Sequence, residues 1–115
     1  MKKITKIMTT LLFASLSTLS YSHQIDIETQ QKLLADGKKY SFDFREGFSI
    51  DTLKNLIQSQ KNIDVEIAPQ VTRHEVANFR LKDVTFLDYL YEGADSLNLE
   101  AVQHGKNKIL LIPKK

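Results

Sequence analysis

Three histidines and several closely spaced carboxylates are the side chains of this chain that could do chemistry. His23, His74 and His104 are scattered through the sequence. None has a second histidine three or four residues away, the spacing that lets one helix hold a metal ion. We therefore expect solvated surface histidines and no metal site. One alternative stays open: if the chain is cut before His23, the new α-amine and the imidazole could bind copper together.

The carboxylates recur in pairs two residues apart, as Asp26 with Glu28 and Asp64 with Glu66. In an extended strand this spacing places both side chains on one face, so we interpret these pairs as the solvent side of a sheet. The chain has no cysteine and only four glycines, and it lacks a Gly-x-Ser-x-Gly turn and a glycine-rich phosphate loop. Thiolate chemistry and disulfides are thus excluded, and we expect no enzymatic activity and no cofactor.

The positive formal charge of the chain comes from its first residues. Lys2, Lys3 and Lys6 supply three of the sixteen basic residues, whereas all fourteen acidic residues follow residue 22. Residues 23–115 therefore carry thirteen basic and fourteen acidic side chains, a net charge of −1. A nucleic-acid-binding surface needs a basic stripe on the folded part of a protein, so nucleic acid is excluded as a partner.

Residues 1–22 have the three parts of a secretory signal peptide: a basic start, an apolar run and small residues before a cut. The run from Ile7 to Leu19 has 13 residues, fewer than the roughly 20 that span a bilayer. Ser20 and Ser22 occupy the −3 and −1 positions of a cut before His23. We therefore expect export to the periplasm and no membrane span in the mature chain, with an uncleaved membrane anchor as the alternative.

The remainder has the length of one small domain. Residues 23–39 are mostly polar and end in a turn cluster, Asp36–Lys39. We interpret residues 23–39 as a linker or arm and residues 40–115 as the folded domain.

Apolar spacing predicts the elements of this domain. Alternation indicates strands, and the strands are expected at residues 40–45, 63–67, 75–81, 97–102 and 108–112. Apolar residues three and four apart indicate helices, and these are expected at residues 49–60 and 85–94, capped by Ser49 and Thr85. In the third strand, Ala77, Phe79 and Leu81 are expected to face inward. The order β-α-β-β-α-β-β predicts an α+β fold in which two helices pack with two small mixed sheets.

Several segments of this domain carry a family resemblance. They are Phe42–Phe44, Ser49–Leu53, Ile63–Val65 and, above all, Phe79–Leu90, with a closing hairpin at Leu97–Glu100 and Ile109–Ile112. In order and spacing they resemble the secretin and TonB short N-terminal (STN) domain, which is also the N0 domain of secretins and the periplasmic signalling domain of some TonB-dependent transporters. Asp83 and Tyr89 depart from the pattern, because the family often has Gly at the first position and a small residue at the second. These departures leave the helix crossing angle open.

The resemblance implies a non-enzymatic interaction module. Domains of this family dock onto inner-membrane or neighbouring components of secretion and pilus machinery, or onto a periplasmic anti-sigma regulator. Because the sequence ends at residue 115, we expect a free-standing periplasmic adaptor or accessory subunit of an outer-membrane secretin or of a TonB-linked signalling complex. Self-association into a homo-oligomer is a further possibility.

Edge strands are templates for a strand from another chain, so the outward residues of the first and third strands are candidate contacts. They are Ser41, Asp43, Arg45, Val76, Asn78 and Arg80. Phe48 and Tyr89 fall off the apolar stripes and are candidates for partly exposed anchors, although a hydrophobic staple beside Ser49 explains Phe48 equally well. The alternative function is a small-ligand carrier or an inhibitor of a periplasmic enzyme. A carrier would need an apolar pocket between helices and sheets.

Overall fold

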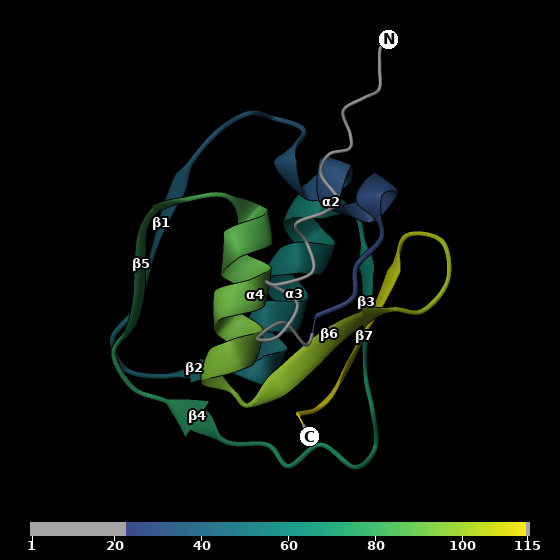
Figure 1. The fold of residues 1–115 in the computed structure, drawn as a ribbon. Coiled ribbons are helices and arrows are strands. Elements are labelled where there is room, and N and C mark those ends of the chain that lie inside the picture. The colour runs from purple at the N-terminus through teal and green to yellow at the C-terminus, as the bar shows by residue number, and fades with distance from the viewer. Residues whose placement is uncertain (1–22, 115) are drawn as a thin grey trace, which may run out of the picture.

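A computed structural model describes residues 23–114. The expected signal peptide lies outside the described residues. Two helices lie between a two-stranded ribbon on one side and a three-stranded sheet on the other (Figure 1), so the α+β prediction is confirmed. The elements, in chain order, are α2 (Ile27–Leu34), β1 (Tyr40–Phe44), β2 (Phe48–Ser49), α3 (Ile50–Lys61), β3 (Asp64–Ile67), β4 (Glu75–Val76), β5 (Phe79–Val84), α4 (Phe86–Ser96), β6 (Leu99–Gln103) and β7 (Lys108–Pro113).

The two layers of strands differ in kind. The ribbon is the antiparallel pair β1–β5, with Phe42 opposite Leu81 and Asp43 opposite Arg80. The sheet has the order β3–β7–β6, in which β3 runs parallel to β7 and β6 runs antiparallel to it. A separate pair of two-residue strands, β2–β4, lies below the helices in Figure 1.

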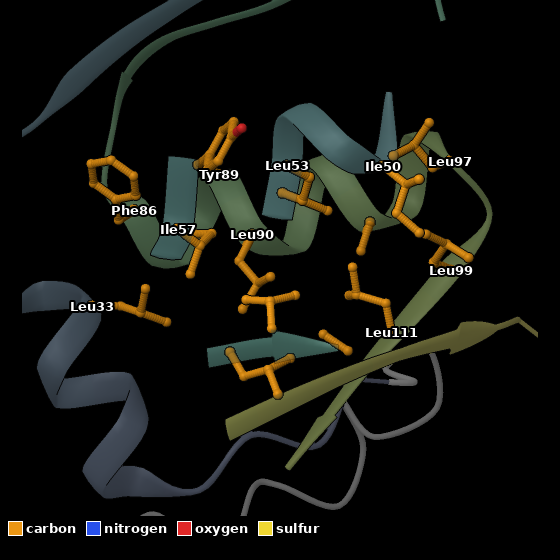
Figure 2. Close-up of a cluster of buried hydrophobic side chains, with 14 of the residues drawn as sticks. Leu33, Ile50, Leu53, Ile57, Phe86, Tyr89, Leu90, Leu97, Leu99 and Leu111 are labelled. Atoms are coloured by element: carbon orange, nitrogen blue, oxygen red, sulfur yellow. The ribbon is translucent and has the colours of Figure 1, made fainter. Parts of the chain in front are cut away.

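The helices begin where the sequence predicts. Ser49 accepts a hydrogen bond from the Thr52 backbone N–H (3.3 Å), and Thr85 forms a reciprocal capping box with Asp88. Each cap satisfies a backbone donor that the first turn leaves unpaired. The two helices then approach closely at Gly93, where an added Cβ would lie 3.0 Å from Leu53 Cδ1. Apolar side chains from α3 and α4 fill the space above the sheet (Figure 2).

The prediction of a linker or arm at residues 23–39 is wrong. The backbone of Gln24 pairs with β6, donating to Ala101 O (2.9 Å) and accepting from Gln103 N (2.7 Å). The helix α2 follows and packs against α4, with Leu33 directed into the core (Figure 2). The buried residues of α2 are Thr29 and Leu33, and Ile25, just before the helix, is buried too, so only one residue in four faces the core. That spacing is too sparse, and too polar at Thr29, to register as an apolar stripe.

The predicted third strand is also divided. Ala77 and Asn78 form a turn between β4 and β5, and Asn78 has a left-handed backbone (φ 59°). Its N–H donates to Arg45 O (3.2 Å), which ties this turn to the end of β1. The turn interrupts the alternation of inward and outward side chains. Ala77 is therefore exposed, whereas Phe79 is buried as expected.

Candidate functional site

The outer face of the β1–β5 ribbon gathers four of the predicted contact residues. Along β1, Phe42 packs into the core while Ser41 and Asp43 are exposed, and Arg45 follows on the same side. Arg80 lies on β5 directly opposite Asp43. The alternation predicted from the sequence is therefore confirmed for Ser41, Asp43, Arg45 and Arg80, which share one solvent-facing surface. We call this surface the ribbon face.

Asp43 is the centre of a small charge cluster on the ribbon face. Its carboxylate lies 3.1 Å from Arg45 Nε and 3.6 Å from Arg80 Nε. All three side chains are substantially exposed, and exposed ion pairs contribute only about 0–1 kcal/mol to stability. The cluster therefore orients two guanidinium groups without contributing much to folding.

The strands of the ribbon are available along their regular half. In the part of the chain that the structure describes, β1 and β5 pair only with each other. A bulge interrupts the register between Tyr40 and Phe42, where Asp83 (φ 59°) donates its N–H to Ser41 Oγ (3.4 Å). Bulges twist a strand and discourage further pairing. Pairing with another chain is thus favoured beside Phe42–Phe44, next to the charge cluster.

A surface hollow of 390 Å³ lies along the same stretch. It is lined by Ser41, Phe42, Asp43, Arg80, Leu81 and Lys82. Among the described residues, the ribbon therefore has a depression, open outer strand edges and charged side chains in one place.

Val76 and Asn78 lie beside the ribbon face and not on it. Val76 is half-buried and pairs with Phe48 in the short β2–β4 ladder. Asn78 shapes the turn at the end of the ribbon through its left-handed backbone. A substitution at Asn78 would change the turn itself, so it is a poor test of partner contact.

The prediction that Phe48 and Tyr89 are partly exposed anchors is wrong, because both side chains have 0% exposure. Phe48 stacks on Phe79 with ring centroids 4.1 Å apart. Tyr89 stacks on Phe42 (4.3 Å), and its burial raises the pKa of the phenol. Phe48 lies beside Leu53 against Gly93, as the hydrophobic-staple alternative requires. Both aromatic residues join the ribbon to the helices.

The outer edge of β6 is occupied by the N-terminal segment of the described chain. His23 Nε2 lies 2.8 Å from Asp95 Oδ1, and Nδ1 accepts the Ala101 N–H (3.0 Å). The ring stacks on Tyr91, and only 3% of the side chain is exposed. The expectation of a solvated histidine is therefore wrong for His23. A copper ion chelated through Nδ1 would have to displace the bond from Ala101.

The predictions for the other two histidines and for Asp64 with Glu66 are confirmed, but the prediction for Asp26 is wrong. His74 and His104 are exposed as predicted, and no group of three or more His, Cys, Asp or Glu residues within 23–114 could hold a metal ion. Asp64 and Glu66 are exposed on β3, near Lys108. Asp26 does not lie in a strand as expected: it caps α2 by accepting the Thr29 N–H (2.9 Å).

One backbone donor of β3 is already hydrogen-bonded within the domain, because Val65 N–H donates to Gln58 Oε1 (3.0 Å). The hollow beside this edge, 460 Å³ in volume, is lined by Ile63 and six polar residues. That lining does not suit an apolar ligand, so it gives no support to a carrier function.

Within residues 23–114, no helix has both the length and the apolar character needed to cross a membrane. Comparison of the chain with protein-family models, curated proteins and solved structures finds no match. The candidate site is therefore identified from its geometry alone.

Proposed function

We propose that this chain is a non-enzymatic interaction module that docks a protein partner on its ribbon face. The observation that carries the proposal is the difference between the edges of the two layers. The β6 edge is covered by Gln24, and the β3 edge is partly capped by Gln58. Among residues 23–114, nothing pairs with the outer edges of the regular half of β1–β5, which lie beside exposed charged side chains. An open strand edge is a template for strand addition.

The proposed setting is the periplasm, where the chain acts as an adaptor or accessory subunit of an outer-membrane secretin or of a TonB-linked signalling complex. Two sequence features support this setting: the signal-peptide pattern of residues 1–22 and the resemblance of residues 40–113 to the STN domain. The observed order of two helices and small sheets is compatible with that resemblance.

Crosslinking in the cell tests this proposal. The tagged chain is expressed, crosslinked in the envelope and purified, and its partners and crosslinked positions are identified by mass spectrometry. We expect a secretin, pilus or TonB-linked component joined to residues of β1 or β5. Recovery of the chain alone, or crosslinks confined to the β3 edge, would contradict the proposal.

A further inference from the structure

The ribbon face is basic although residues 23–115 as a whole are not. Arg45 and Arg80 flank Asp43, and Lys82 follows on β5 along the same hollow. The side chains of Arg45 and Arg80 are 70% and 59% exposed. Arg45, Arg80 and Lys82 thus gather around the Asp43 carboxylate, whereas residues 23–115 have a net charge of −1.

The two guanidinium groups keep unused hydrogen-bonding capacity. Among the described residues, Asp43 is the one ion-pair partner of Arg45 and of Arg80. A guanidinium has five N–H donors, about ten for the pair, whereas a carboxylate offers about four acceptor sites. Asp43 therefore holds both guanidinium groups in place but leaves some of their N–H donors free to bind a partner. By contrast, Arg73 has a carboxylate to itself, since its Nη1 lies 2.8 Å from Asp51 Oδ1.

The shape of the site favours an extended chain over a compact anion. The hollow runs along Ser41–Asp43 and Arg80–Lys82, beside strand edges that can bond a partner backbone. In an added strand, side chains on one face recur about 7 Å apart, two residues along the chain. Carboxylates with this spacing would reach the guanidinium groups of the ribbon face and form charge-assisted, bidentate hydrogen bonds.

We infer that the partner segment docked on the ribbon face is an extended peptide with Asp or Glu at alternate positions. This inference rests on the proposed function and specifies the chemistry of the partner. Charge complementarity supports this inference. Asp43 of the domain orients the two guanidinium groups, and carboxylates of the partner accept hydrogen bonds from their remaining N–H donors.

The test measures binding of labelled nine-residue peptides to the purified exported chain by fluorescence anisotropy. The probe alternates Glu and Val, and the control peptides carry Lys in place of Glu or the same Glu residues in one block. We expect the alternating acidic peptide to bind at least tenfold more tightly than either control, with affinity that falls as salt rises. Equal binding of the Lys peptide would overturn the inference.

Two charge-reversal variants locate the site. The double variant Arg45→Glu with Arg80→Glu should weaken binding of the acidic peptide at least tenfold. The matched control Arg73→Glu removes a basic charge from an arginine of similar exposure away from the ribbon face, and it should change affinity by less than about twofold. Thermal melts establish that each variant is folded, and an unfolded double variant is replaced by the single variant Arg80→Glu. Equal loss in Arg73→Glu would contradict the inference.

The same variants separate this inference from the proposed function. If the double variant still captures the cellular partner through β1 or β5, the proposed function holds and the acidic segment is wrong. If neither the wild-type chain nor the double variant captures a partner, the proposed function itself fails. Binding to vesicles of phosphatidylglycerol, with none to the acidic peptide, would assign the cations to a membrane surface and would also overturn the inference.

Discussion

At the scale of single residues, Asp83 has a strained backbone conformation. Asp83 has a φ of 59°, in the left-handed region that costs a residue with a Cβ about 1–2 kcal/mol. Gly adopts this conformation freely because it has no Cβ. Asp, with its short polar side chain, is one of the few other residues that tolerate it.

We therefore predict that Asp83→Gly stabilises the domain by about 0.5–1 kcal/mol, because it relieves the left-handed strain. Urea unfolding followed by circular dichroism measures the difference. The control is Asp64→Gly, at an exposed position in the regular strand β3, where added chain entropy should destabilise the domain. A loss of stability in Asp83→Gly would show that the Asp side chain, and not the backbone, is what the bulge requires.

His23 provides a second prediction at this scale. Its ring accepts the Ala101 N–H and holds the start of the segment that pairs with Gln103. Replacement by Ala should expose the edge of β6, so amide hydrogen exchange at Ala101 and Gln103 should accelerate. The Ala68 N–H, bonded to Leu111 O on the other side of the sheet, is the internal control. Unchanged protection at Gln103 would mean that Gln24 pairs without the help of His23.

At the scale of elements, the packing of α3 on α4 depends on Gly93. An added Cβ would lie 3.0 Å from both Leu53 Cδ1 and Phe48 Cζ, and both side chains are fully buried. Alanine gains about 1 kcal/mol of helix propensity, whereas overpacking a core typically costs 1–3 kcal/mol.

Because both neighbours are fully buried, we predict that Gly93→Ala destabilises the domain by about 1 kcal/mol and Gly93→Val by more. Thermal unfolding of both variants checks the order. The exposed position Ser59 on α3 is the reference, since Ser59→Ala should leave stability within about 0.5 kcal/mol of wild type. A stabilised Gly93→Ala would show that the helices can separate at little cost.

Two carboxylates tether the N-terminal segment and α2, and they predict a dependence on pH. Hydrogen bonds from the Tyr40 hydroxyl, the Lys38 backbone and Lys61 Nζ lower the pKa of Asp36. For Asp95, burial opposes ionisation, but hydrogen bonds from Lys114 and His23 outweigh it, so its pKa is also lowered. Each group therefore stabilises the folded state above the unfolded pKa of about 4, and this stabilisation is lost as pH falls through the lowered folded-state pKa.

We predict that α2 loosens from the domain below about pH 4, before the β3–β7–β6 sheet is lost. Amide exchange measured from pH 6 down to pH 3, corrected for intrinsic rates, follows the two regions separately. In Asp36→Asn, part of the protection of α2 should already be missing at pH 6, with a smaller further loss on acidification. An identical pH profile in wild type and Asp36→Asn would rule out a role for this carboxylate.

At the scale of the whole molecule, the sequence predicts what lies within one element, and the contacts between layers decide the rest. The helix caps at Ser49 and Thr85 and the outward set of β1 depend on neighbours in sequence, and these predictions are confirmed. The sequence pattern misplaces Tyr89 because α4 lies between two layers and is buried on two sides. Figure 2 shows Leu90 directed to the sheet and Tyr89 to the opposite side of the helix. A single apolar stripe cannot describe such a helix.

Hydrophobic periodicity does not reveal the N-terminal segment for a related reason. Its attachment to β6 uses the imidazole of His23 and the backbone of Gln24, and neither contributes to hydrophobic periodicity. The same segment also determines which edge of the molecule stays open. Alternation along β1 thus predicts part of the ribbon face from the sequence. That the ribbon, and not β6, has the open strand edge follows only from the three-dimensional arrangement.

Site-specific photocrosslinking in the cell tests the central claim, that the ribbon face is where the partner docks. A photoreactive amino acid is placed at Ser41 on this face, which leaves both arginines in place, or, as the control, at Ser59 on the exposed surface of α3. Our account predicts a crosslinked partner from position 41 and none from position 59. A partner captured equally from both positions, or from position 59 alone, would contradict it.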